Sequence, residues 1–265
     1  MSQVVHIGTS GWSYADWVGP FYPAGTPPGD YLARYAQHFD VVEVDSTYYR
    51  PPGRQMVQNW AGRTPAHFRF ALKAPGEITH KKVLHDCDAE MEVLLEALEP
   101  LRAKTLCVLW QFGYFNRKAF ASATPFFEQL AAFLVQYAGR TPLAVEIRNK
   151  QWLSADYFDL LRRHGAAAAL VEHSWLPRID RLIEEHDVIT APFSYCRLIG
   201  DRKGIEQVTE TWDRPVVDRT EDLTRVAAAL RRIAQRVPVY TFANNHYAGH
   251  GPDTCRRLRE LIDRR

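Results

Sequence analysis

The chain has 265 residues, of which 46% are hydrophobic and 24% are charged, and its formal net charge is +2. This composition is ordinary for a soluble globular protein and argues against a disordered chain, while the small net charge neither requires nor excludes a nucleic-acid partner. The opening residues lack a signal-peptide pattern and no apolar run approaches about 18 residues, so we expect a cytoplasmic protein that does not enter a membrane.

Eight short apolar runs, each ending in a polar or charged residue, alternate with helix-like or loop segments along the chain. The first four predict strands at 4–9, 41–47, 68–73 and 106–111, with helices near 29–39, 55–61, 89–98 and 125–137. In the helix near 125–137 the apolar residues recur at helical spacing.

The second half continues this pattern, with strands expected at 143–148, 167–173, 194–199 and 239–244 and helices near 152–164, 221–235 and 253–263. No clear pattern follows the sixth strand. Residues 200–219, after the seventh strand, have weak periodicity, and a connection that long predicts a lid over the strand ends. Together these elements predict one domain over residues 1–265, a single (β/α)8 TIM barrel whose chemistry lies at the C-terminal ends of its strands.

Four cysteines are spread along the chain without a C-x-x-C pair: Cys87, Cys107, Cys196 and Cys255. Their spacing indicates neither a zinc ribbon nor a disulfide framework. We expect buried, reduced thiols.

Side chains two apart on a strand share a face, so the polar face of each expected strand should line the barrel. This alternation directs seven charged residues inward: Glu43, Asp45 and Glu146 against Arg69, Lys73, Arg148 and Arg197. Four cations against three anions leave a positive surplus that would suit a phosphate or carboxylate near Lys73, Arg148 and Arg197. The alternative is a structural network of ion pairs that fixes the register of the strands.

Six motifs, in order along nearly the whole chain, resemble the YecE-like family of unknown function. They are GTSGW (8–12), VEVDSTYYRPP (42–52), FRFALKAPGEITH (68–80), LWQF (109–112), VEIRNKQW (145–152) and FANN (242–245). The resemblance implies a TIM barrel and no established reaction. A suggested similarity of such barrels to endonuclease IV and sugar isomerase barrels is an analogy of fold. This chain has Ile199 where the family often has a histidine, which removes one candidate ligand or base.

The candidate site residues lie at the ends of the expected strands or in the loops that follow. We expect catalytic roles for three of them, with Glu146 as general acid or base and Asp45 orienting Lys73. Substrate-binding residues would be Arg148 and Arg197 for the anion, Gln111 and Asn245 as neutral hydrogen-bonding groups, and Trp12, Tyr48 and His80 from loops that mix aromatic and basic residues.

These residues predict an enzyme that acts on a phosphate-bearing substrate, a phosphoester hydrolase with nucleic acid among its candidate substrates. One alternative is a carbohydrate-processing enzyme that uses Glu146 with Glu43 or Asp45 as paired carboxylates. Another is a barrel that binds an anionic metabolite or RNA without turnover. Lys73 is also a candidate Schiff-base lysine. No obligate protein partner is indicated.

A divalent metal is a weaker expectation. The candidate ligands are Asp45, Glu146, Glu172, His173 and His246. They do not form an obvious set of three or four on successive strand ends, and only one of two consecutive strand residues can point inward. We therefore do not favour a cofactor.

Overall fold

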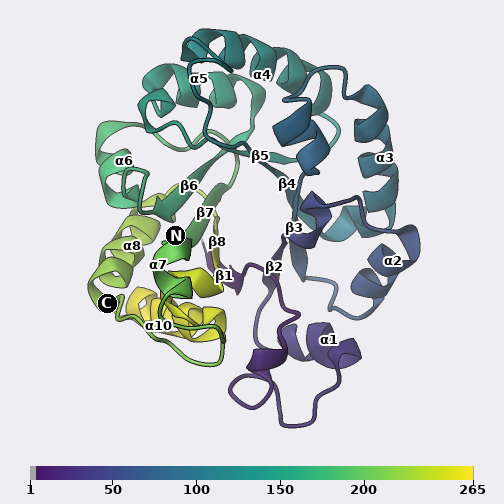
Figure 1. Ribbon diagram of the computed structural model, residues 1–265, viewed down its shortest axis with the longest axis vertical. Helices are drawn as coiled ribbons and strands as arrows, with labels where there is room; N and C mark the ends of the chain where they lie inside the picture. Colours follow the sequence, from purple (N-terminus) through teal and green to yellow (C-terminus); the bar gives the residue numbers. More distant parts are fainter. Residues whose placement is uncertain (1–3, 265) are drawn as a thin grey trace.

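Eight parallel strands form the centre of the molecule in a computed structural model that describes residues 4–264. The strands are β1 (Val5–Thr9), β2 (Val41–Val44), β3 (Arg69–Lys73), β4 (Thr105–Gln111), β5 (Leu143–Glu146), β6 (Ala167–His173), β7 (Ser194–Gly200) and β8 (Val239–Ala243). They follow one another in the order β1-β8-β7-β6-β5-β4-β3-β2, and helices surround them (Figure 1). The predicted (β/α)8 TIM barrel is confirmed.

The helices differ from the prediction mainly in the first and seventh units. They are α1 (Tyr31–Tyr35), α2 (Arg54–Gly62), α3 (Asp88–Leu98), α4 (Ala123–Tyr137), α5 (Ala155–His164), α6 (Ile179–Glu185), α7 (Arg202–Glu206), α8 (Thr220–Ile233), α9 (Asn245–Ala248) and α10 (Gly251–Asp263). The helix predicted near 29–39 is reduced to α1, because a 3-10 turn over Pro28–Asp30 replaces its start. Helix α6 fills the segment that showed no clear pattern.

The seam between β1 and β2 is closed by side chains as well as backbone. These two strands stand at opposite ends of the strand order and meet at an isolated bridge between Ser10 and Glu43. In the layer between strands and helices, the Tyr35 hydroxyl accepts a hydrogen bond from the backbone N–H of Thr9 at 2.8 Å and donates one to the carbonyl of Val41 at 3.0 Å. The hydroxyl of one tyrosine from α1 therefore replaces part of the backbone hydrogen bonding between β1 and β2.

Two separate apolar layers confirm the predicted alternation of side chains. Val42, Val44 and Phe70 belong to the layer between strands and helices. Inside the barrel, Tyr195 and Phe242 pack in one layer with Ala71, Ala144, Ala167, Ala169, Cys107, Val41, Leu106, Leu109 and Val171. The alanines and Cys107 take up little volume, which leaves room for long polar side chains above them.

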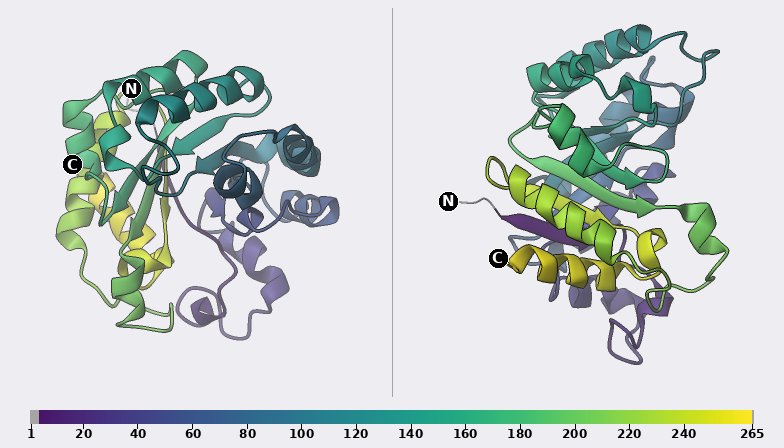
Figure 2. Two further views of the ribbon diagram at one scale, coloured as in Figure 1. Left: turned by 45° about the horizontal axis from the view of Figure 1, so that its top comes forward. Right: turned by 90° about the vertical axis from the view of Figure 1, so that its left-hand side faces the viewer.

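The start of β1 and the end of α10 lie at the opposite end of the barrel from α7. In the right-hand view of Figure 2, they are on one side, and α7 projects beyond the strands on the other. The backbone N–H of Trp212 donates to Asp16 at 3.0 Å, and that of Val216 donates to the carbonyl of Ala248 at 2.7 Å. The segment predicted as a lid is thus attached to the first loop and to α9; whether it moves stays a prediction.

The four cysteines are free and buried, as the sequence predicts. None of the helices within residues 4–264 combines the length and the apolar character that a membrane crossing would need.

Candidate active site

A buried ion-pair network occupies the C-terminal end of the barrel interior. Arg197 on β7 is only 3% exposed, and its Nε and Nη2 donate to the two carboxylate oxygens of Glu43 at 2.7 and 2.6 Å. Its Nη1 donates to Glu146 at 2.8 Å. We call Glu43, Glu146 and Arg197 the buried triad. The bidentate arrangement fixes the guanidinium plane, and both glutamates have no exposed surface.

Glu43 is held by partners on β7 and at the end of β1. The Ser10 hydroxyl, just after β1, donates to it at 2.7 Å, and the Tyr195 hydroxyl on β7 donates at 2.5 Å. Both carboxylate oxygens of Glu43 are therefore satisfied by donors. This arrangement matches the structural network that the sequence left open as an alternative for Glu43.

Arg148 extends the triad toward solvent from just beyond β5. Its Nη2 lies 2.6 Å from Oε1 of Glu146, and its side chain is 16% exposed. The buried Nε of Arg148 has no hydrogen-bond partner among the described residues. Burial alone would raise the pKa of Glu146, but Arg148 and Arg197 outweigh that effect and hold this pKa below its ordinary value. Glu146 therefore remains ionised near neutral pH.

Asp45 lies at the mouth with an unusual carboxyl group. Because β2 ends at Val44, Asp45 starts the connection to a 3-10 turn, and 35% of its side chain is exposed while Oδ1 itself is buried. Oδ1 lies 3.5 Å from Nη2 of Arg197 and has no hydrogen-bond donor among the described residues. Burial, and then the negative charge of Glu43, raise the pKa of Asp45 to about 6. This carboxyl can both give and accept a proton near neutral pH.

Lys73, the last residue of β3, is a basic residue of the same mouth. Its Nζ is 4.7 Å from the centre of the Tyr48 ring, and within residues 4–264 no carboxylate forms an ion pair with it. Burial, and then the positive charge of Arg197, lower the pKa of Lys73. We call Asp45 and Lys73 the open pair, since each retains an unsatisfied group near solvent.

Tyr48 and His80 form one wall beside Lys73. Their rings meet edge to face with centres 5.1 Å apart. Burial and the nearby charge of Lys73 lower the pKa of His80, so this imidazole is neutral near pH 7. A Cβ atom at Gly76 would come within 2.7 Å of the Tyr48 ring, so only glycine allows this position of the tyrosine. The structure therefore brings Tyr48, His80 and Lys73 together; their roles stay a prediction.

Gln111 and Asn245 are near strand ends but are engaged in local bonds. Gln111 is paired in register with Glu146, and its Nε2 donates to the carbonyl of Phe112 at 2.8 Å. Asn245 is buried in α9, and its Oδ1 accepts the backbone N–H of Gly251 at 2.8 Å. Asn245 thus holds the start of α10.

Trp12 and Arg69 lie outside the charged site. The Trp12 ring packs edge to face on Trp60 and Phe70 in the layer between strands and helices. Arg69 donates from Nη1 to the carbonyl of Ala66 at 2.9 Å, at the start of β3 and away from the mouth. Strand alternation predicts that Arg69 faces the barrel interior, but it does not predict how far along the barrel axis the residue lies.

The candidate metal ligands do not converge. Glu172 points out of the barrel and accepts the backbone N–H of Ile179 at 2.8 Å. His246 lies 3.2 Å from Glu206 of α7 through its Nε2. In the part of the chain that the structure describes, no group of three or more histidine, cysteine, aspartate or glutamate side chains is placed to hold a metal ion.

No site role was expected from the sequence for Ser10 or Tyr195, and His173 was expected only as a candidate metal ligand. Ser10 lies directly after β1, where a polar residue at a strand end is a usable signal. Tyr195 lies on β7 and Glu43 on β2, so their hydrogen bond joins two strands that are far apart in sequence. His173 lies at the end of β6, and its pKa is lowered by burial and then by the positive charge of Arg148.

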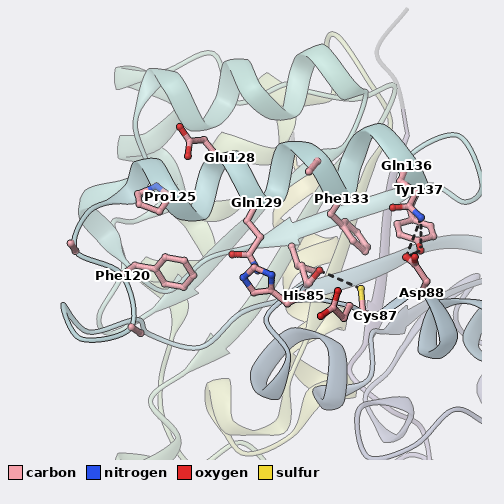
Figure 3. Close-up of a pocket in the computed structure, with 15 residues that line it drawn as sticks. His85, Cys87, Asp88, Phe120, Pro125, Glu128, Gln129, Phe133, Gln136 and Tyr137 are labelled. Atoms are coloured by element: carbon pink, nitrogen blue, oxygen red, sulfur yellow. Dashed lines mark hydrogen bonds between the residues drawn. The ribbon is translucent and has the colours of Figure 1, made fainter.

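A separate cavity of about 700 Å³ lies outside the barrel, between residues 84–88 and α4 (Figure 3). Its acidic residue Asp88 accepts hydrogen bonds from Tyr137 and, at 3.1 Å, from Gln136. None of the residues that line this cavity belongs to the buried triad or the open pair. We therefore place the candidate active site at the barrel mouth.

Comparison with known families gives a match over almost the whole chain. The model of a family described as "Protein of unknown function DUF72" matches residues 6–265. A crystal structure of a DUF72 family protein from Thermotoga maritima superposes with a TM-score of 0.78 at 27% sequence identity. The superposition covers 98% of this chain and 99% of that one.

Two curated relatives match part of the chain. The UPF0759 protein YecE of Escherichia coli strain K12 is 33% identical over 154 residues, or 57% of this chain and 51% of that protein. The UPF0759 protein YunF of Bacillus subtilis strain 168 is 28% identical over 166 residues, or 59% of this chain and 55% of that protein. The chain spans about half the length of the curated relatives it matches.

Proposed function

Because this chain belongs to the DUF72 family, whose description names no reaction, we propose its function from the chemistry of the barrel mouth: an enzyme acting on a small anionic substrate. The resemblance to YecE-like proteins predicted from the motifs is confirmed by the same match and by the relatives YecE and YunF. The substrate carries a phosphate or carboxylate group.

The observation that carries this proposal is the open pair. Lys73 contributes a positive charge that no described carboxylate neutralises by a direct ion pair, and Arg148 contributes a buried Nε without a partner. Beside them, Asp45 has a pKa of about 6 and a partly exposed side chain. Acid–base catalysis on an anionic substrate requires a site that binds the anion and, next to it, a group that exchanges protons near neutral pH.

The proposed roles differ from those expected from the sequence. Asp45, expected to orient Lys73, is the proton donor or acceptor, because its carboxyl titrates near neutral pH. Glu146, expected in that role, is fully buried and bound by both Arg148 and Arg197. Arg197 was expected to bind the anion, but two glutamates occupy its donors, so we assign it to holding the site together.

Phosphate-ester hydrolysis, the reaction predicted from the sequence, is one reaction that these groups support. Lys73 and Arg148 would neutralise the phosphoryl oxygens while Asp45 protonates the leaving oxygen. A small substrate is favoured over a nucleic acid, because four basic residues near the mouth have acidic partners. These pairs are Lys81–Glu77, Lys82–Glu90, Arg202–Glu206 and Arg214–Asp213. A phosphate backbone binds best to unpaired cations.

The carbohydrate alternative has less support. Paired-carboxylate mechanisms need two carboxyl groups that reach the sugar. Glu43 and Glu146 have no exposed surface, and both are bound to Arg197. Of the three carboxylates that this alternative would use, only Asp45 is partly exposed.

The test is calorimetric titration of the protein with inorganic phosphate and with citrate at pH 7. Lys73→Ala and Arg148→Ala should each weaken binding about 10- to 100-fold, since a hydrogen bond to a charged group contributes about 1.5 to 3 kcal/mol. Lys81→Ala is the matched control, because it removes the same charge from an exposed site. Equal binding by all variants would contradict the proposal, and tight, salt-sensitive anisotropy with single-stranded DNA would favour a nucleic acid instead.

A further inference from the structure

Lys73 has surroundings that an electrostatic anion clamp does not require. Its ammonium is seated over the Tyr48 ring, with Nζ 4.7 Å from the ring centre, rather than against a carboxylate. Both glutamates of the site are already bound to guanidinium groups, Glu43 to Arg197 and Glu146 to Arg148 and Arg197. The amine is thus free of direct bonds to the described acids while remaining inside a charged site.

The surroundings of Lys73 lower the pKa of its amine. Burial lowers its pKa most, and the positive charge of Arg197 lowers it further, while Asp45, Glu146 and Glu43 oppose the shift. His80 stands beside the amine and is itself kept neutral. Amines with a lowered pKa, set by desolvation and by a neighbouring cation, are the ones that attack carbonyl groups in enzymes.

We propose that Lys73 is a nucleophile that forms an imine with its substrate, so that the substrate is a small aldehyde or ketone that also carries a phosphate or carboxylate group. This inference rests on the proposed function, because the anionic group would be held by Arg148. It narrows that function from any anionic substrate to carbonyl compounds.

The step balances with groups already at the mouth. The lone pair of Nζ bonds to the carbonyl carbon, the carbonyl oxygen takes up a proton, and the nitrogen loses one, which gives a carbinolamine. Asp45 then protonates the hydroxyl group, which leaves as water while the nitrogen lone pair forms the C=N bond. Amine and carbonyl become imine and water, and neither an oxidant nor a reductant is needed. A carboxyl with a pKa of about 6 can supply this proton and recover it.

Reductive trapping tests the imine directly. The intact protein is incubated with pyruvate, glyoxylate or dihydroxyacetone phosphate, with and without sodium borohydride, and analysed by intact mass and peptide mapping. We expect a stable adduct on the peptide that contains Lys73, formed only when carbonyl compound and borohydride are both present. Formaldehyde, which has a carbonyl but no anionic group, should label Lys73 no more than surface lysines.

Two variants separate nucleophilicity from charge. Lys73→Arg keeps the positive charge and cannot form the imine, so its adduct should fall at least about 10-fold, whereas Lys82→Arg, on the surface, should label like the wild type. If Lys73→Arg does not fold, the peptide map of the wild-type protein still identifies the labelled residue. An adduct confined to other lysines overturns the proposal.

The two proposals fail in distinguishable ways. If no carbonyl probe labels Lys73 but phosphate binding weakens in Lys73→Ala, Lys73 is a charge clamp and the imine is wrong while the proposed function stands. If phosphate and citrate do not bind and nothing labels Lys73, both are wrong.

Discussion

The buried triad and the open pair contain the same kinds of charged group, yet their surroundings give them different properties. In the triad, Arg197 is 3% exposed and its donors are matched to two glutamates at 2.6 to 2.8 Å. In the open pair, Asp45 is partly exposed and Lys73 has an aromatic ring in place of an acid. Complete pairing fixes a protonation state, whereas incomplete pairing leaves a pKa close to neutral and a group available to a substrate.

The largest effect that this comparison predicts is on stability in the triad. Arg197→Met should lower the free energy of unfolding by about 3 to 5 kcal/mol, because two buried carboxylates lose their common partner. Urea denaturation followed by circular dichroism measures it. Arg214→Met, in an exposed pair with Asp213, should change stability by about 0.5 kcal/mol or less. Equal losses in both variants would erase the distinction between the triad and a surface pair.

A smaller loss is expected when one donor to the triad is removed. Tyr195→Phe deletes the hydroxyl that donates to Glu43 at 2.5 Å and should lower the free energy of unfolding by about 1 to 2 kcal/mol. The same denaturation experiment on Tyr240→Phe is the control, because the Tyr240 hydroxyl forms no hydrogen bond with another described side chain. A Tyr195→Phe protein as stable as the wild type would show that Arg197 and Ser10 alone satisfy Glu43.

The smallest effect belongs to the open pair and depends on pH. The folded protein raises the pKa of Asp45 from 3.8 to about 6, so the folded state binds its proton more tightly than the unfolded state. Its contribution to stability is therefore present below about pH 4 and is lost as the pH rises toward 6. Asp45→Asn should remove this dependence. The unfolding temperature of the variant, measured relative to that of the wild type, should therefore rise as the pH is raised from 4.5 to 7. A difference that does not vary with pH would show that Asp45 does not titrate in this window.

Most residues of the candidate site could be predicted from the sequence, because side chains alternate along a strand and this alternation shows which of them face inward. Glu43, Glu146 and Arg197 were all placed on the inner face in this way. Their pairing could not be predicted, since Glu43 and Arg197 are 154 residues apart and lie on strands that are not neighbours. Which charges are neutralised depends on the distances between the charged side chains and on their partners, and knowing which face of a strand points inward does not give these.

Element boundaries were harder to predict than faces. The strand expected to run to residue 47 ends at Val44, so Asp45 is in a turn that exposes it. Trp12 was expected to bind substrate, but its position depends on contacts with Trp60 and Phe70 that come from distant segments. An aromatic residue in a long loop can line a site or complete a core, and its sequence neighbours do not distinguish the two.

The hydroxyl of Tyr35 has a consequence for how the protein avoids self-association. A sheet that fails to close exposes two strand edges, and such edges pair with other chains. Here β1 and β2 are joined by one bridge at Ser10 and Glu43 and by the Tyr35 hydroxyl below it. One oxygen atom on a short helix therefore helps to keep the two edges of the barrel from becoming templates for aggregation.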